Sequence, residues 1–150
     1  MNKLCHLAYL EIRRIGSIRQ YVSFETTNTL VSSLVLSRLD YCTALLAGSP
    51  QVLLDTIQRV INCSARFTFK VPKSAHFTPF LYDLHWLPIS SRIQYKIALI
   101  CFHIVSGTSP PFISELLHLN SPSHSLRSAA DTRIFHVPST GRTLGERSFQ

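Results

Sequence analysis

The sequence has few acidic residues, and no two of them are adjacent. Among 150 residues there are eight Asp and Glu against 15 Lys and Arg. The sequence therefore lacks the paired aspartates with which two-metal enzymes hold their ions. It also has neither a Gly-x-Ser-x-Gly nucleophile elbow nor a phosphate loop ending in Gly-Lys-Ser/Thr. We expect no catalytic residues and no enzymatic activity from this chain on its own.

Cysteine is scarce and is not arranged for metal binding. The four cysteines lie tens of residues apart, without a Cys-x-x-Cys pair or a His-x(3–5)-His partner. Cys101 and His103 come closest to a pair of metal ligands, but the residues around them are more typical of a helix core. We therefore predict no metal site and no cofactor.

Long apolar runs are also missing. The longest, residues 97–105, contains His103 and is far shorter than the roughly 18 residues of a membrane span. The first residues are interrupted by Glu11, Arg13 and Arg14 before a signal-type apolar core can form. We expect an intracellular protein of the nucleus or cytoplasm that is neither secreted nor inserted in a membrane.

What is present is a helical pattern with enough apolar residues for one core. Apolar residues make up 45% of the chain, and their spacing is helical almost everywhere before residue 120. We predict an all-α bundle of about six helices over residues 1–119, then a basic, Ser/Pro-rich tail over 120–150 that is irregular, partly extended or disordered. The helices are expected over about 3–20, 23–48, 50–70, 78–88, 88–107 and 109–118.

Local signals support several of these boundaries. Ser23 is a suitable N-cap, and Gly48 and Gly107 can end helices in the left-handed conformation. The fifth helix carries an isoleucine stripe that we expect to face the core along its whole length, so that Ile97→Asp would unfold the bundle. Its members are Ile89, Ile93, Ile97, Ile100 and Ile104.

The excess of positive charge predicts a polyanionic partner. The formal net charge is +7 and the sequence pI is about 9.6, so the backbone of RNA or DNA is the first candidate. Rows of basic residues lie opposite the apolar faces of the first, third and fifth helices. They can also be ordinary solvated faces, and a membrane-surface helix is the further alternative for the first. The candidate nucleic-acid-binding residues are Arg13, Arg14, Arg19, Arg59, Arg66, Lys70, Arg92 and Lys96.

Two residues are assigned structural roles. On a straight helix Arg38 falls between two apolar rows, so we expect a buried ion pair with Asp55 or Asp83; contact with a phosphate is the alternative. Trp86 is the sole tryptophan and stands at a corner between two helices. We expect it to fill the core, although a stacking platform for a base is the functional alternative.

Short strings along the chain resemble a known family. They are Ser37-Arg38-Leu39-Asp40-Tyr41-Cys42, His85-Trp86-Leu87-Pro88, Ser125-Leu126-Arg127-Ser128, and Val137-Pro138 followed by Gly145-Glu146-Arg147-Ser148-Phe149. In this order they resemble the segment downstream of the polymerase palm in the reverse-transcriptase polyprotein of LINE-type (non-LTR) retrotransposons, of the chicken-repeat and Jockey-like kind. The string Ile12-Arg13-Arg14-Ile15 is similar to the pattern near that family's thumb, which grips template and primer.

The resemblance implies the end of an RNA-directed DNA polymerase without its catalytic part. The expected function is therefore that of a non-catalytic remnant, at most a helical module that binds the nucleic-acid backbone. In the parent polyprotein the reverse-transcriptase core would be a further partner. The alternatives are a protein-interaction scaffold that braced the polymerase, and the product of a degenerate open reading frame with no selected function.

Overall fold

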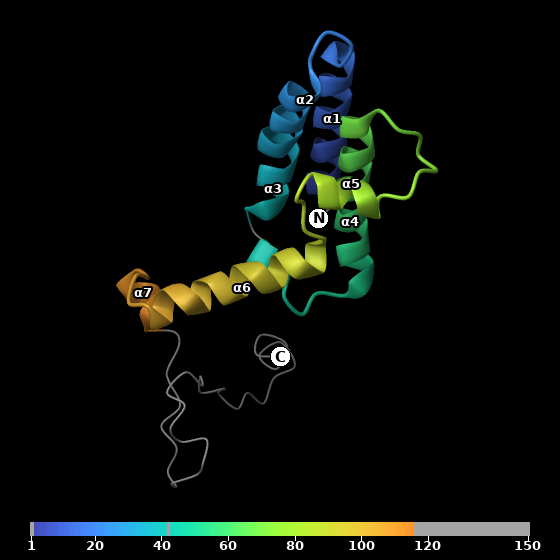
Figure 1. Cartoon of the computed structure of the whole chain (residues 1–150). Coiled ribbons are helices and arrows are strands. Elements are labelled where there is room, and N and C mark those ends of the chain that lie inside the picture. Colours follow the sequence, from blue (N-terminus) through green and yellow to red (C-terminus); the bar gives the residue numbers. More distant parts are fainter. Residues whose placement is uncertain (1, 42, 116–150) are drawn as a thin grey trace, which may run out of the picture. The chain divides into compact units, whose positions relative to one another are not determined.

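The computed structural model describes residues 2–41 and 43–115, and all regular structure in these ranges is helical (Figure 1). The fold class is therefore all-α, as the sequence predicts. The expected tail over 120–150 lies outside the described residues. The elements are α1 (Asn2–Ile18), α2 (Phe24–Val31), the π-helical segment η1 (Ser32–Leu36), α3 (Ser37–Asp40), the 3-10 helix η2 (Thr43–Leu46), α4 (Gln51–Phe69), α5 (Thr78–Asp83), α6 (Ile89–Val105) and α7 (Pro111–Ser114).

The chain divides into two compact units, residues 1–94 and 95–150, with the boundary inside α6. In the first unit α4 packs against α1, α2 and α5, and Figure 1 shows α1, the α2–α3 segment and α4 running side by side. The described part of the second unit is the rest of α6, followed by α7. The boundary that the sequence predicts at residue 119 lies outside the described residues.

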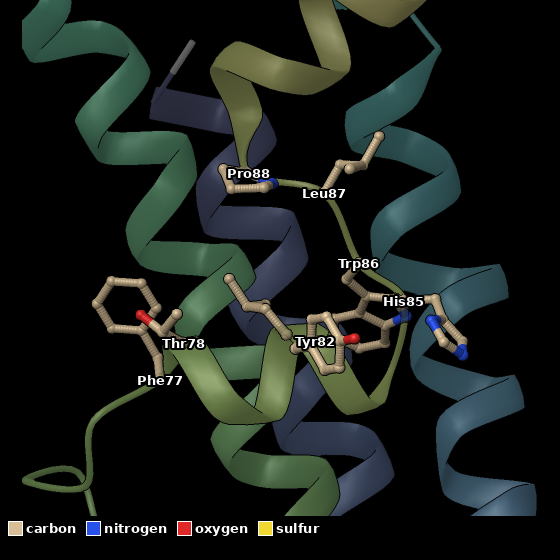
Figure 2. Close-up of a pocket in the computed structure, with 8 residues that line it drawn as sticks. Phe77, Thr78, Tyr82, His85, Trp86, Leu87 and Pro88 are labelled. Carbon is tan, nitrogen blue, oxygen red and sulfur yellow. The ribbon is translucent and has the colours of Figure 1, made fainter.

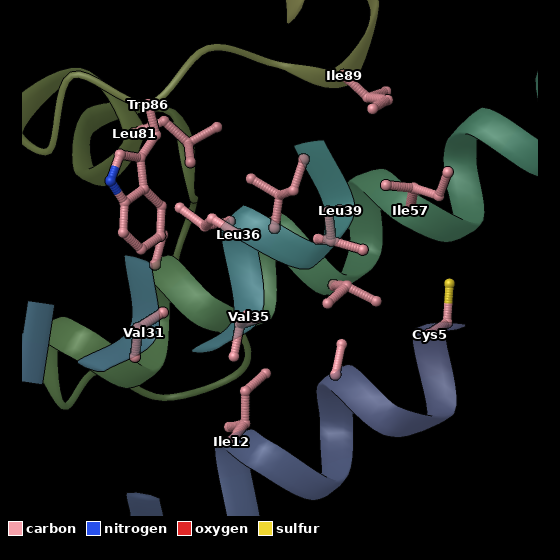
Figure 3. Close-up of a cluster of buried hydrophobic side chains, with 14 of the residues drawn as sticks. Cys5, Ile12, Val31, Val35, Leu36, Leu39, Ile57, Leu81, Trp86 and Ile89 are labelled. Carbon is pink, nitrogen blue, oxygen red and sulfur yellow. The ribbon is translucent and has the colours of Figure 1, made fainter. Parts of the chain in front are cut away.

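The core of the first unit is built from one apolar face of each helix (Figure 3). Helix α4 contributes the most completely buried side chains, and Trp86 adds its indole from the segment after α5. A line of aromatic rings, Phe24, Phe69 and Phe80, joins α2, α4 and α5 with centroids 5.1 and 4.9 Å apart. The core includes Ala8, Ile12, Ile15, Val31, Val35, Leu36, Leu39, Ile57, Val60, Ile61, Ala65, Leu81, Leu84, Ile89 and Ile93.

The prediction of one long helix over residues 23–48 is wrong, because this segment is not one continuous α-helix. Ser23 does cap α2, because its side chain accepts a hydrogen bond from the N–H of Thr26. The helix then widens into η1, where the N–H of Ser37 bonds to the carbonyl of Ser32, and it ends at Asp40. Each residue in a π-turn advances by less than the 100° of an α-helix, so every later side chain lags behind its straight-helix position.

This lag corrects the prediction for Arg38. Its side chain is 45% exposed and does not lie between two buried rows. Its partner is neither Asp55 nor Asp83 but Glu11 of α1, whose carboxylate accepts from Arg38 Nη1 at 3.2 Å and from Arg14 Nη1 at 3.1 Å. The buried member of the pair is Glu11, with 10% of its side chain exposed.

Helices α4, α5 and α6 end in the same hydrogen-bonded motif. In each, a left-handed residue follows the helix, and the N–H of the next residue bonds to a carbonyl five positions back. Gly107 takes this place after α6, as the sequence predicts. Lys70 and His85 take it after α4 and α5, both with φ +56° although they carry a Cβ. Helix α5 therefore ends before Pro88, at Asp83.

The strained residue after α5 gives a test of this motif. His85→Gly should raise the free energy of unfolding by about 1 kcal/mol, because glycine adopts the left-handed conformation without the steric cost of a Cβ. Urea unfolding followed by circular dichroism measures the change. His85→Ala is the control, since it removes the imidazole and keeps the Cβ. Equal stability of the two variants would contradict the assigned strain.

The isoleucine stripe of α6 is buried only in its first part. Ile89 and Ile93 belong to the core of the first unit, whereas Ile97 and Ile100 are exposed. The prediction that the whole stripe faces the core is therefore wrong. Helical spacing places these residues on one face, but spacing alone does not determine how far along the helix a neighbour covers that face.

Paired substitutions on this stripe test the difference. Ile93 is 7% exposed and Ile97 is 39% exposed, so Ile93→Asp should unfold the first unit by burying an unpaired carboxylate. Ile97→Asp should leave the helical signal intact and lower the melting temperature by only a few degrees. Thermal melts of both variants check this, and a parent-like melt for Ile93→Asp would show that its face is not core.

Candidate nucleic-acid interface

Helices α1 and α4 pack side by side and are parallel. Arg19, just after α1, donates from Nη2 to the carbonyl of Thr68 near the end of α4, at 2.8 Å. Earlier along both helices, burial raises the pKa of Tyr9, the thiols of Cys63 and Cys5 raise it further, and nearby Arg59 partly opposes them. The charge of Arg59 on α4 therefore acts on Tyr9 of α1.

The segment after α4 folds back along this helix. Arg66 holds it, because Nε of Arg66 donates to the carbonyl of Ala75 at 2.8 Å and its guanidinium lies 5.6 Å from the ring centroid of Phe77. Burial raises the pKa of the Cys63 thiol, while the charges of Arg66 and Lys73 lower it. The charges of both cations therefore act on the Cys63 thiol.

We group the cations of α1, α4 and the segment that follows α4 as the basic face. On α1 its member is Arg13, which is exposed and lies one helical turn after Tyr9. Of the acids on the two helices, Glu11 pairs with Arg14 and Arg38, whereas Asp55 is exposed one turn before Arg59 and accepts from Gln51 Nε2 at 2.8 Å. The basic face consists of Arg13, Arg59, Arg66, Lys70 and Lys73, all of them cationic.

Two predicted binding residues are used inside the fold instead. Arg19 donates to the carbonyls of Val22 and Thr68, so its guanidinium joins the ends of α1 and α4. Its Nε is buried without a hydrogen-bond partner among the described residues. The prediction that Arg19 binds nucleic acid stays a prediction, and the contacts in the structure give it a structural role.

Arg92 is the second predicted binding residue that is used inside the fold. Its Nη1 donates to both carboxylate oxygens of Asp40, at 2.7 and 2.8 Å, and its Nε donates to the carbonyl of Leu87 at 2.7 Å. Only 12% of the side chain is exposed. Arg92 therefore ties the start of α6 to the end of α3 through charged hydrogen bonds.

The remaining predicted binding residues differ in their exposure and pairing. Arg14 is exposed but paired with Glu11, Lys96 is half-buried in the second unit, and Lys70 is exposed at the left-handed position after α4. Lys73 was missed by sequence reasoning, because it lies in a polar break between helices. Trp86 is buried in the core.

The division between structural and free arginines predicts different effects on stability. Arg92→Gln should lower the free energy of unfolding by about 1–3 kcal/mol, because it removes charged hydrogen bonds and leaves Asp40 unpaired. Arg59→Gln, the matched control on the exposed basic face, should change it by less than about 0.5 kcal/mol. Urea titrations of both variants measure this. Equal losses would contradict the internal role of Arg92.

In the described ranges, no helix is both long enough and apolar enough to cross a membrane, and no group of three or more His, Cys, Asp and Glu side chains is arranged to hold a metal ion. Comparison with protein-family models, with curated proteins and with solved structures gives no match to this chain.

Proposed function

We propose that this chain is a non-catalytic module, derived from the post-palm segment of a LINE-type reverse transcriptase, that binds the backbone of RNA or DNA through its basic face. The observation that carries the proposal is the set of cations on α1, α4 and the segment after α4, of which Arg59 and Arg66 lie two turns apart on one side of α4. Phosphates would release counterions on binding there. The resemblance of the sequence strings supports the same function.

The geometry favours contacts to the backbone over reading of bases. The cations come from two parallel helices and one loop, and Arg59 and Arg66 lie two turns apart along α4. Arg66 donates from Nε to the carbonyl of Ala75. A row of cations that reads no base edge binds different sequences with similar affinity.

A second candidate, a protein-interaction scaffold, is supported by α6. Several large apolar side chains on this helix are exposed, an arrangement typical of surfaces that contact another protein. In the parent polyprotein the reverse-transcriptase core would be the partner. The residues are Tyr95, Ile97, Ile100, Phe102 and Val105.

Oligonucleotide titration at several salt concentrations tests the first proposal. The full chain should bind RNA and DNA with a Kd of about 1–100 μM and little sequence preference. Arg13→Gln combined with Arg59→Gln should weaken every sequence equally and reduce the slope of log K against log salt by about 1.8, the value for two phosphate contacts.

The matched control removes the same charge from α1 without touching the basic face. Lys3→Gln combined with Arg14→Gln should leave the salt slope nearly unchanged, because Arg14 is already paired with Glu11. Equal losses in both double variants would mean that net charge, and not this face, drives binding. Absence of binding at low salt would overturn the proposal, and self-association by light scattering would then favour the scaffold.

A further inference from the structure

An open cavity of about 420 Å³ lies between α5 and the segment that leads to α6. The left-handed His85 and the bond from Trp86 N–H to the carbonyl of Leu81, 2.8 Å long, turn the chain back over α5. Figure 2 shows Tyr82 beside Trp86, with Phe77 at the other side and Leu87 and Pro88 above. The volume is within the range of small-molecule pockets, about 300–1,000 Å³.

The walls of the cavity are aromatic and apolar, and part of them faces water. Trp86 is nearly buried and belongs to the core, whereas Tyr82 is 80% exposed and Leu87 is 44% exposed. No acidic residue lines the cavity. A hydrated hollow of this kind favours an occupant with a flat apolar face, because such a group stacks on the rings and displaces water.

Phe77 connects this cavity to the basic face. Phe77 lines the cavity, and its ring centroid lies 5.6 Å from the guanidinium carbon of Arg66. The ring of His76 stacks on Phe77 with centroids 5.3 Å apart. The occupant that fits an aromatic hollow beside a row of cations carries a flat ring and negative charge on the same molecule, as a nucleotide does.

We propose that the cavity receives an unpaired base of a single-stranded nucleic acid whose phosphates lie on the basic face. The inference rests on the proposed function and adds a preference for single strands. In a duplex the bases are already stacked on one another, so only an unpaired base can leave the strand and stack on Tyr82. Aromatic stacking beside a positive groove binds single strands with little sequence preference.

The test compares oligothymidylate, an abasic strand of equal length and a duplex, each titrated against the full chain. Tyr82→Ala should weaken binding of oligothymidylate about tenfold, the loss of one base stack, and change duplex and abasic binding less than about twofold. Tyr41→Ala is the control, because Tyr41 is 89% exposed and does not line the cavity. Trp86, the sole tryptophan, should lose fluorescence when oligothymidylate binds, and not when the duplex binds.

The outcomes separate this inference from the function on which it rests. If all strands bind with a steep salt dependence, but Tyr82→Ala and Trp86 emission show no difference between them, the basic face stands and the base pocket is wrong. If no strand binds at low salt, both proposals fail. If Tyr82→Ala abolishes self-association in light scattering and leaves oligonucleotide binding unchanged, the occupant is a second copy of this chain.

Discussion

The burial of one face of α4 is the constraint on which the rest of the structure depends. Ile57, Val60, Ile61, Ser64, Ala65 and Thr68 are almost fully buried along this face, and α1, α2 and α5 pack around the helix. The small residues among them let the neighbouring backbones approach closely. The hydroxyls of Ser64 and Thr68 donate to carbonyls one turn earlier, at 2.9 and 3.0 Å, so the buried polar atoms have partners.

This packing determines where the remaining charge can lie. One face of α4 is buried, and Arg59 and Arg66 lie on the opposite side of this helix. The few acids of the first unit are then placed where arginines must be held: Glu11 beside Arg38 and Asp40 beside Arg92. These two acids therefore neutralise arginines that join helices of the first unit.

The same packing places an aromatic hollow next to the cations. Helix α5 is held to α4 through Phe80 and Phe69, and Arg66 holds the connecting segment at Ala75 and Phe77. Arg66 is thus a structural anchor and a member of the basic face at the same time.

The sequence by itself determined the helices and most of their ends, because these depend on residues a few positions apart. The hydroxyl of Ser23, the left-handed Gly107 and the apolar spacing on α1 and α4 act within one or two helical turns. The end of α4 at Lys70 agrees with the predicted range 50–70. The end of α5 before His85 was not predicted, since a non-glycine residue takes the left-handed conformation only when packing compensates its cost.

Only the tertiary structure decided which arginines are free. Arg38 and Glu11 are 27 residues apart, and Arg92 and Asp40 are 52 apart, so no local pattern links them. The π-turn in η1 rotated Arg38 away from its straight-helix position. On α6, the buried isoleucines are Ile89 and Ile93, which belong to the core of the first unit. A helical repeat gives the direction of a side chain, but the partner it meets depends on how distant segments pack.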